Sequence, residues 1–237
     1  MAQPLDPSSL AADSALTQAG LVIFDFDGVV ADSEVLSLAT LQRSLSAFGI
    51  TLSLEKVREA FLGTSLLTIS RYVCDRSPNR SADEFAEHWQ HKLFASFRKE
   101  LAPIVGIERV LDQLDLQRTP YCIASSGSFE RIGVALDAIG LTHRFPHVFS
   151  SEQVENGKPA PDLFLLAAQN MNVAPELCVV IEDSPFGVQA AKAANMPCIG
   201  FLGGSHLEDV AEGHCAELIR HGANLVVNSY QALLTAG

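Results

Sequence analysis

A short apolar run that ends in two aspartates constrains the fold of this chain more than any other feature. Residues Leu21-Val-Ile-Phe24 are all apolar and include two β-branched side chains, which is typical of a strand buried on both faces. The run is followed at once by Asp25-Phe-Asp-Gly28. A strand of this kind needs other strands beside it and helices on both sides, so it predicts the interior of a parallel α/β sheet.

The second half of the chain holds further apolar runs of this kind. Further strand-like runs alternate with segments of helical periodicity, and they are Tyr121–Ala124, Val148–Phe149, Cys178–Ile181, Cys198–Phe201 and Leu225–Val227. Successive strand–helix units build a parallel sheet with right-handed crossovers. We therefore expect a Rossmann-like α/β core domain, with helices on both faces of the sheet, made of residues 20–31 and 104–237.

Residues 32–103 interrupt the alternation with a wholly helical pattern. Two apolar stripes recur at helical spacing, and they are Leu38, Leu41, Leu45 and Phe48, then Phe85, Trp89, Leu93 and Phe97. We expect a small all-helical cap domain, inserted after the first strand and standing over the carboxyl edge of the sheet. Residues 1–19 hold prolines and serines but no Lys or Arg, which predicts a disordered tail and not a signal peptide.

Composition excludes some classes of partner. The net charge of −12 argues against nucleic acid, whose phosphates need a basic surface. No apolar stretch is long enough for a membrane span. The five cysteines are odd in number and none form a C-x-x-C pair, which favours reduced thiols in a cytoplasmic protein. The sequence sets no oligomeric state.

Polar residues gather where the predicted strands end and where a helix begins. They are Asp25 and Asp27, then Ser125 and Ser126, then Lys158, then Glu182 and Asp183. Because the carboxyl ends of parallel strands share one edge, we expect these side chains to converge.

Such a cluster suits phosphoryl transfer. Asp25, Asp27 and Asp183 would repel one another without a cation, and Mg²⁺ suits a site of few carboxylates and a substrate phosphate. Lys158 supplies a fixed positive charge. Gly28 lets backbone N–H groups approach an anion closely.

Four short motifs in this order resemble those of the haloacid dehalogenase superfamily. The first is Asp25-Phe-Asp-Gly-Val-Val-Ala-Asp-Ser-Glu34, and Ser125, Lys158-Pro159 and Glu182-Asp-Ser184 match the others. The resemblance covers residues 21 to about 230. The chain is most similar to the group that holds β-phosphoglucomutases and sugar-phosphate phosphatases.

The resemblance implies a role for each acidic residue. Asp25 would be the nucleophile that forms an aspartyl-phosphate. Asp27 would be general acid and then general base. Mg²⁺ would be held by Asp25, the backbone carbonyl of Asp27, and Asp183. Glu182 would lie outside the ligands and orient water on the metal. Family members that cleave carbon–halogen bonds or phosphonates resemble one another in lacking the second aspartate, so Asp27 favours phosphate esters.

The resemblance also implies how phosphate and substrate are held. Ser125 and Lys158 would bind the transferring phosphoryl group, helped by the backbone around Gly28 and Ser126. Specificity would belong to the cap, where a turn is expected to reach the substrate and three arginines are candidates for a second anionic group; these residues are Gly63, Thr64 and Ser65, and Arg43, Arg58 and Arg71. The expected substrate is a small phosphorylated sugar, polyol or sugar acid.

Two alternatives stand beside the phosphatase. One is a phosphomutase of the β-phosphoglucomutase type, but Ser37 and Leu66 stand where those enzymes carry a His and an Arg in the cap, which favours water as acceptor. The other is an inactive binding module, which the complete set of motifs disfavours. His206 follows the predicted strand Cys198–Phe201; its favoured interpretation is an ordinary loop residue, and the alternative is a place near the edge of the site.

Overall fold

Six parallel strands form one sheet in the computed structural model, which describes residues 16–62, 64, 66–77 and 80–234. The order across the sheet is β3-β2-β1-β4-β5-β6, and every neighbouring pair is parallel. The strands are β1 (Leu21–Phe24), β2 (Tyr121–Ser125), β3 (Val148–Ser150), β4 (Cys178–Glu182), β5 (Cys198–Phe201) and β6 (Leu225–Val227). The predicted α/β sheet is confirmed, with three strands one residue longer than expected.

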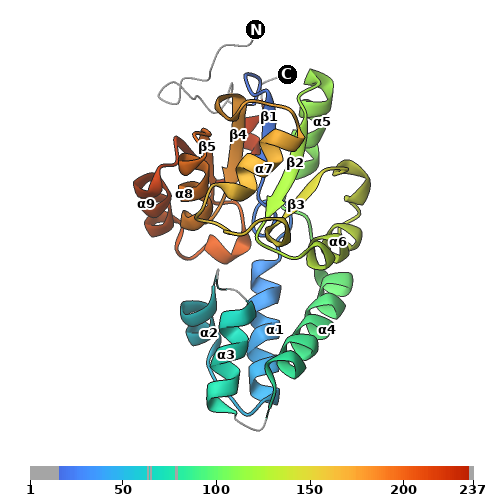
Figure 1. Ribbon diagram of the computed structural model, residues 1–237, viewed down its shortest axis with the longest axis vertical. Coiled ribbons are helices and arrows are strands. Elements are labelled where there is room, and N and C mark those ends of the chain that lie inside the picture. The colour runs from blue at the N-terminus through green and yellow to red at the C-terminus, as the bar shows by residue number, and fades with distance from the viewer. Residues whose placement is uncertain (1–15, 63, 65, 78–79, 235–237) are drawn as a thin grey trace.

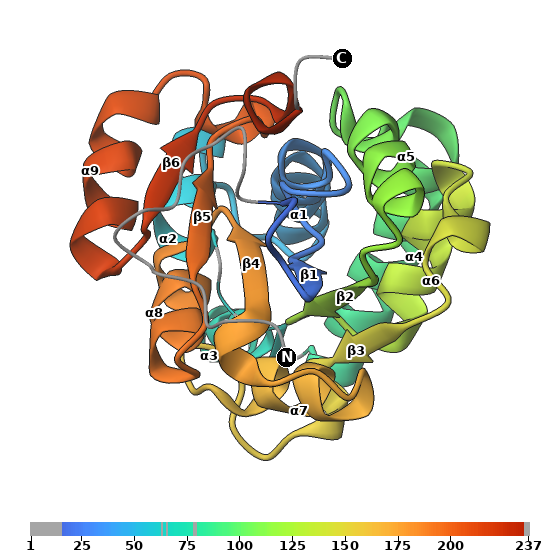
Figure 2. The same cartoon turned by 90° about the horizontal axis from the view of Figure 1, so that it is seen from above.

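Helices cover both faces of this sheet (Figure 2). They are α5 (Ile107–Gln117), α6 (Phe129–Ala138), α7 (Asp162–Asn170), α8 (Pro185–Ala193) and α9 (Ala211–His221), with 3₁₀ turns η1 (Thr142–Arg144), η2 (Ser151–Gln153), η3 (Pro175–Leu177), η4 (Ser205–Leu207) and η5 (Tyr230–Leu233). Side chains of β1 alternate between the two faces. Val22 and Phe24 join the apolar cluster that includes α5 and α6, whereas Leu21 and Ile23 join the cluster with α7 and α8. The central strand is therefore buried on both sides, as its composition predicts.

Four helices stand together beyond one edge of the sheet (Figure 1). They are α1 (Glu34–Ala47), α2 (Leu54–Phe61), α3 (Leu66–Arg76) and α4 (Ala82–Glu100). The predicted apolar stripes are buried between them. The two connections to the sheet run side by side, since the Asp32 amide donates to the Ala102 carbonyl (3.0 Å) and the Ile104 amide to the Val30 carbonyl (2.9 Å).

The beginning of the chain differs from the predicted tail. Residues 1–15 lie outside the described residues, but Leu16 is 1% exposed and Ala19 is also buried. These apolar side chains join the main apolar cluster, so the burial of Leu16 outweighs the polar composition around it. All five cysteines are described and are free thiols. Within the described residues, none of the helices has the length and apolar character to cross a membrane.

Candidate active site

The order in which the strands are added reverses at the centre of the sheet, where β1 lies between β2 and β4. Asp25 follows β1, and its amide donates to the Ile181 carbonyl of β4 at 2.9 Å. Asp183 follows β4 directly. The sheet therefore brings together two aspartates that are far apart in the sequence, at the edge where parallel sheets bind ligands.

Three buried carboxylates meet at this edge. One oxygen from each of Asp25, Glu182 and Asp183 lies within 4.8 Å of the others. Burial raises the pKa of Asp25 well above its ordinary value, and the charge of Glu182 raises it further. The pKa of Asp183 is raised by the same two causes. Asp25 and Asp183 are thus short of positive charge, which a hard divalent cation would supply.

Lys158 is the cation that faces this cluster. Its Nζ donates to Asp25 Oδ1 at 2.5 Å and to Glu182 Oε2 at 2.8 Å, with the side chain only 4% exposed. Burial alone would lower the pKa of Lys158, but the charges of Asp25 and Glu182 outweigh it and raise the pKa. Lys158 therefore remains charged, and it holds Asp25 in place.

Glu182 is fixed by bonds at both of its oxygens. Oε2 accepts from Lys158, while Oε1 accepts from the amide of Ser184 (2.9 Å) and from its hydroxyl (2.8 Å). Gly187 of α8 leaves room for this carboxylate, because a Cβ there would lie 2.0 Å from Glu182 Cδ. The side chain orients Lys158 and the start of α8.

Gly28 makes room on the other side of the cluster. Its φ of +78° lies in the left-handed region that favours glycine, and a Cβ would lie 2.0 Å from Asp183 Oδ2. Any other residue would be strained there and would displace the carboxylate. The glycine after the second aspartate is therefore required by both backbone and space.

The predicted serines also lie at the site. Ser125 is 1% exposed, and its Oγ accepts from the Gly127 amide at 3.0 Å. Since the hydroxyl accepts there, its own hydrogen remains available for an anion. Ser128 caps α6, accepting from the Arg131 amide at 3.2 Å.

A cavity of about 340 Å³ opens beside these groups. It is lined by Asp25, Asp27, Ser125, Ser126, Lys158, Glu182 and Asp183, by Glu34 and Leu62 from the cap, and by further residues of the core. Such a volume suits a small ligand. The predicted core residues are thus brought together, in a space enclosed between sheet and cap.

The comparison with known families follows the same residues. A model of haloacid dehalogenase-like hydrolases matches residues 22–201, a range that spans every motif described above. The chain belongs to this hydrolase family. Among its relatives, the fructose-1-phosphate phosphatase of Escherichia coli is 35% identical over 187 residues, or 76% of this chain and 95% of the relative.

Two further proteins are similar to this chain over most of its length. The 6-phosphogluconate phosphatase of Escherichia coli is 32% identical over 187 residues, or 78% of this chain and 83% of the relative. A family hydrolase of Deinococcus radiodurans, solved with bound phosphate and sodium, superposes with a TM-score of 0.71 at 30% identity. That likeness covers 92% of this chain and 99% of the other.

The cap residues expected to reach the substrate are only partly described. Gly63 and Ser65 lie outside the described residues. Thr64 is exposed, and its hydroxyl donates to the Phe61 carbonyl at 2.9 Å, which closes the turn after α2. Of the three cap arginines, Arg58 reaches the core, where it donates to the backbone carbonyl of His206.

Three residues at the site were not predicted as functional. His206 is buried against the cavity, with Nε2 3.3 Å from Asp183 Oδ2, so its interpretation as an ordinary loop residue is wrong. His206 belongs to η4, the 3₁₀ turn that follows β5. Glu34 also lines the cavity, and Arg131 contacts Asp27 at 2.7 Å. Arg131 could have been found from the sequence as a basic residue in the first helical turn after the Ser125 motif.

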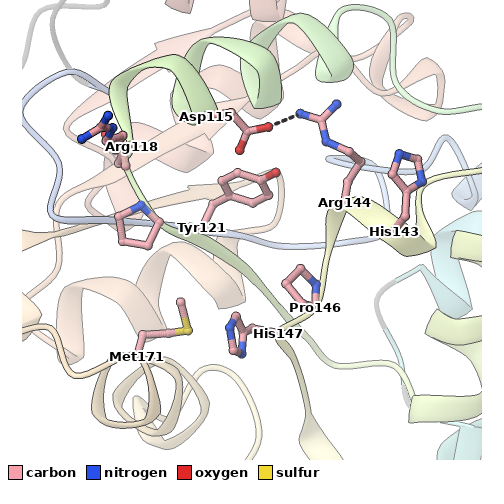
Figure 3. Close-up of a pocket in the computed structure, with 10 residues that line it drawn as sticks. Asp115, Arg118, Tyr121, His143, Arg144, Pro146, His147 and Met171 are labelled. Carbon is pink, nitrogen blue, oxygen red and sulfur yellow. Dashed lines mark hydrogen bonds and ion pairs between the residues drawn. The ribbon is translucent and has the colours of Figure 1, made fainter.

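A second hollow, of about 540 Å³, lies at the amino ends of β2 and β3 (Figure 3). Arg144 is already paired there with Asp115 and Asp112, each at 2.9 Å. Tyr121 and His147 also line it; Tyr121 is the first residue of β2, and His147 directly precedes β3. This hollow is at the opposite edge of the sheet from the carboxylates, so it is separate from the hydrolase site.

Proposed function

We propose that this hydrolase is a Mg²⁺-dependent phosphatase of small phosphorylated metabolites, acting through an aspartyl-phosphate on Asp25. The observation that carries the proposal is the convergence of Asp25, Asp183 and Lys158 beside a cavity of about 340 Å³. The names of its relatives support the substrate class, since they are phosphatases of a sugar phosphate and a sugar-acid phosphate. The phosphate in the Deinococcus radiodurans structure supports the ligand.

The donor set fits a magnesium ion. Asp25 and Asp183 offer hard carboxylate oxygens, and the backbone carbonyl of Asp27 is the third proposed ligand. Glu182 is left outside this set because Lys158 and Ser184 already occupy its oxygens. When bound, the ion would neutralise the carboxylates and the charge on the transferring phosphoryl group.

The chain's own residues would carry out two steps. In the first, a carboxylate oxygen of Asp25 bonds to phosphorus, the ester P–O bond breaks, and Asp27 gives its proton to the leaving oxygen. In the second, water bonds to phosphorus, Asp27 takes the water's proton, and the bond to Asp25 breaks. Lys158 and the Ser125 hydroxyl hold the phosphoryl oxygens in both steps. The products are an alcohol and inorganic phosphate.

Phosphate release from a panel of sugar, polyol and sugar-acid monophosphates tests the proposal. We expect hydrolysis with Mg²⁺, no hydrolysis in excess EDTA, and recovery when Mg²⁺ is restored. Ca²⁺ should bind without supporting turnover, because its looser coordination does not hold the in-line geometry. Full activity in excess chelator, or no release from any monoester or from p-nitrophenyl phosphate, would contradict it.

A further inference from the structure

Arg131 joins the proposed general acid to the cap. It lies in the first turn of α6, and its Nη2 donates to Asp27 Oδ1 at 2.7 Å and to Ser37 Oγ of α1 at 3.1 Å. The Arg131 and Asp27 side chains are 18% and 16% exposed. An ion pair so shielded from water is more directional than one on the surface.

The two oxygens of Asp27 have different surroundings. Oδ1 accepts from the Ser33 hydroxyl as well as from Arg131. Within the described residues, no donor is recorded on Oδ2. Because Asp27 lines the cavity, the oxygen that remains for a proton and for the substrate is Oδ2.

The surroundings of Arg131 would be unfavourable for an arginine without a function, because they remove part of its guanidinium from water. Its Nε is buried and has no hydrogen-bond partner among the residues that the structure describes. Burial alone would lower the pKa of Arg131, but the charges of Asp27 and Glu34 raise it. The guanidinium also lies 5.7 Å from the ring centroid of Phe97 in α4. A partly buried cation with a buried, unpaired nitrogen calls for an explanation.

We propose that Arg131 is a positioning residue for the phosphatase reaction. It holds Oδ1 of Asp27, so that Oδ2 carries the proton that passes to the leaving oxygen as the ester P–O bond breaks. The carboxylate left on Asp27 is then stabilised by the fixed charge of Arg131 until it takes a proton from water. This inference rests on the proposed function.

Two phosphate esters of similar size separate positioning from a structural role. p-Nitrophenolate leaves as a stable anion without a proton, whereas the alkoxide of benzyl phosphate needs one. In Arg131→Gln, kcat/KM for benzyl phosphate should fall about 100-fold, while kcat/KM for p-nitrophenyl phosphate should fall less than about tenfold. Since kcat/KM reports the step up to aspartyl-phosphate formation, slow hydrolysis of that intermediate does not mask the effect.

Two more variants complete the design. Arg131→Lys keeps a charge and a donor, so it should recover about tenfold of the benzyl phosphate loss. Arg144→Gln removes an ion-paired arginine at the opposite edge of the sheet (Figure 3), so both esters should keep wild-type rates. If Arg131→Gln does not fold, the selective loss must still appear, in smaller degree, in Arg131→Lys.

Equal losses for the two esters in the Arg131 variants would overturn the positioning role and leave a structural tie between core and cap. Unchanged rates for both esters would overturn it as well. Failure of the wild-type protein to hydrolyse either ester with Mg²⁺ would instead defeat the phosphatase proposal, so the two failures are distinguishable.

Discussion

At the scale of single residues, the carboxyl group of Asp25 is buried in a crowded, negatively charged setting. It is 7% exposed, touches Lys158, and lies close to two other carboxylates. Its raised pKa shows that the folded chain tolerates its charge at a cost. Groups with strongly shifted pKa values cluster at functional sites, so we expect Asp25 to serve chemistry and not stability.

Replacing Asp25 by Asn separates its contribution to turnover from its effect on stability. The amide cannot attack phosphorus, so we expect kcat to fall at least about a thousandfold. The thermal midpoint should be equal or higher, because one of three crowded negative charges is removed. Asp112→Asn, an exposed partner of Arg144, is the control for both measurements. Retention of a tenth of wild-type turnover would remove Asp25 from the role of nucleophile.

Ser37 carries a prediction about the acceptor. Its hydroxyl accepts from Arg131, and a serine at this position is a poor proton relay to a sugar hydroxyl. We therefore expect water to be the acceptor. With β-glucose 1-phosphate and a trace of glucose 1,6-bisphosphate, free phosphate should form without glucose 6-phosphate. Rapid formation of glucose 6-phosphate with little free phosphate would establish the mutase instead.

Residues at strand ends were predictable because chain order alone brings them to one edge. Asp25, Ser125 and Asp183 each follow a run of apolar residues. The parallel sheet then places the carboxyl ends of these runs side by side. Arg131 and His206 were not predictable in this way. Their positions depend on which direction a helix or loop side chain takes, and three-dimensional packing decides that.

At the scale of elements, the start of α8 is fitted to Glu182. Ser184 caps the helix, accepting from the Gly187 amide at 3.0 Å, and it also donates to Glu182. The helix backbone passes so close that a side chain at position 187 has no space. The end of β4, the N-cap residue Ser184 and the first turn of α8 thus form one unit that orients the Glu182 carboxylate.

A pair of glycine variants tests this unit. Gly187→Ala should lower stability by about 1–3 kcal/mol, because Glu182 cannot yield without breaking its bonds to Lys158 and Ser184. Activity should fall with it. Gly213→Ala in α9 is the matched control, since a Cβ there meets nothing within 4 Å, and it should add about 0.5–1 kcal/mol. Thermal unfolding measures both, and equal stability of the two variants would contradict this reading of α8.

Element type was more predictable than element limits. Short β-branched runs and four-residue apolar steps identify strands and helices, and all six expected strands form. Strands β2, β3 and β4 extend one residue further because Ser125, Ser150 and Glu182 still pair with neighbouring strands. Hydropathy does not record such pairing. The burial of Leu16 was missed for a related reason, since one apolar residue in a polar segment carries no period.

At the scale of the whole molecule, apolar packing of α4 against α6 joins the cap to the core, and polar contacts add to it. Arg58 donates to the His206 carbonyl, Ser37 accepts from Arg131, and Asp32 accepts from the Ser205 hydroxyl at 2.8 Å. Polar contacts of this kind exchange readily with water. The two connections run side by side, so we expect any hinge for movement of the cap to lie there.

Small-angle scattering checks whether the cap moves. With Mg²⁺ and orthovanadate, a mimic of the transferring phosphoryl group, we expect a smaller radius of gyration than in the protein alone, because closure excludes water from the site. Asp25→Asn with the same additions should show no compaction. An identical envelope for the wild-type protein in both conditions would count against a moving cap.

The central claim is that Asp25 becomes phosphorylated, and direct trapping of the intermediate tests it. In Asp27→Asn, p-nitrophenyl phosphate and Mg²⁺ should still phosphorylate the enzyme, while loss of the general base slows hydrolysis of the intermediate. After an acid quench, mass spectrometry should find one phosphoryl group on Asp25 in this variant, and none when Asp25 is also replaced by Asn. A phosphoryl group on Ser125 or any other residue, or nitrophenol release by Asp27→Asn without any phosphoenzyme, would contradict the account.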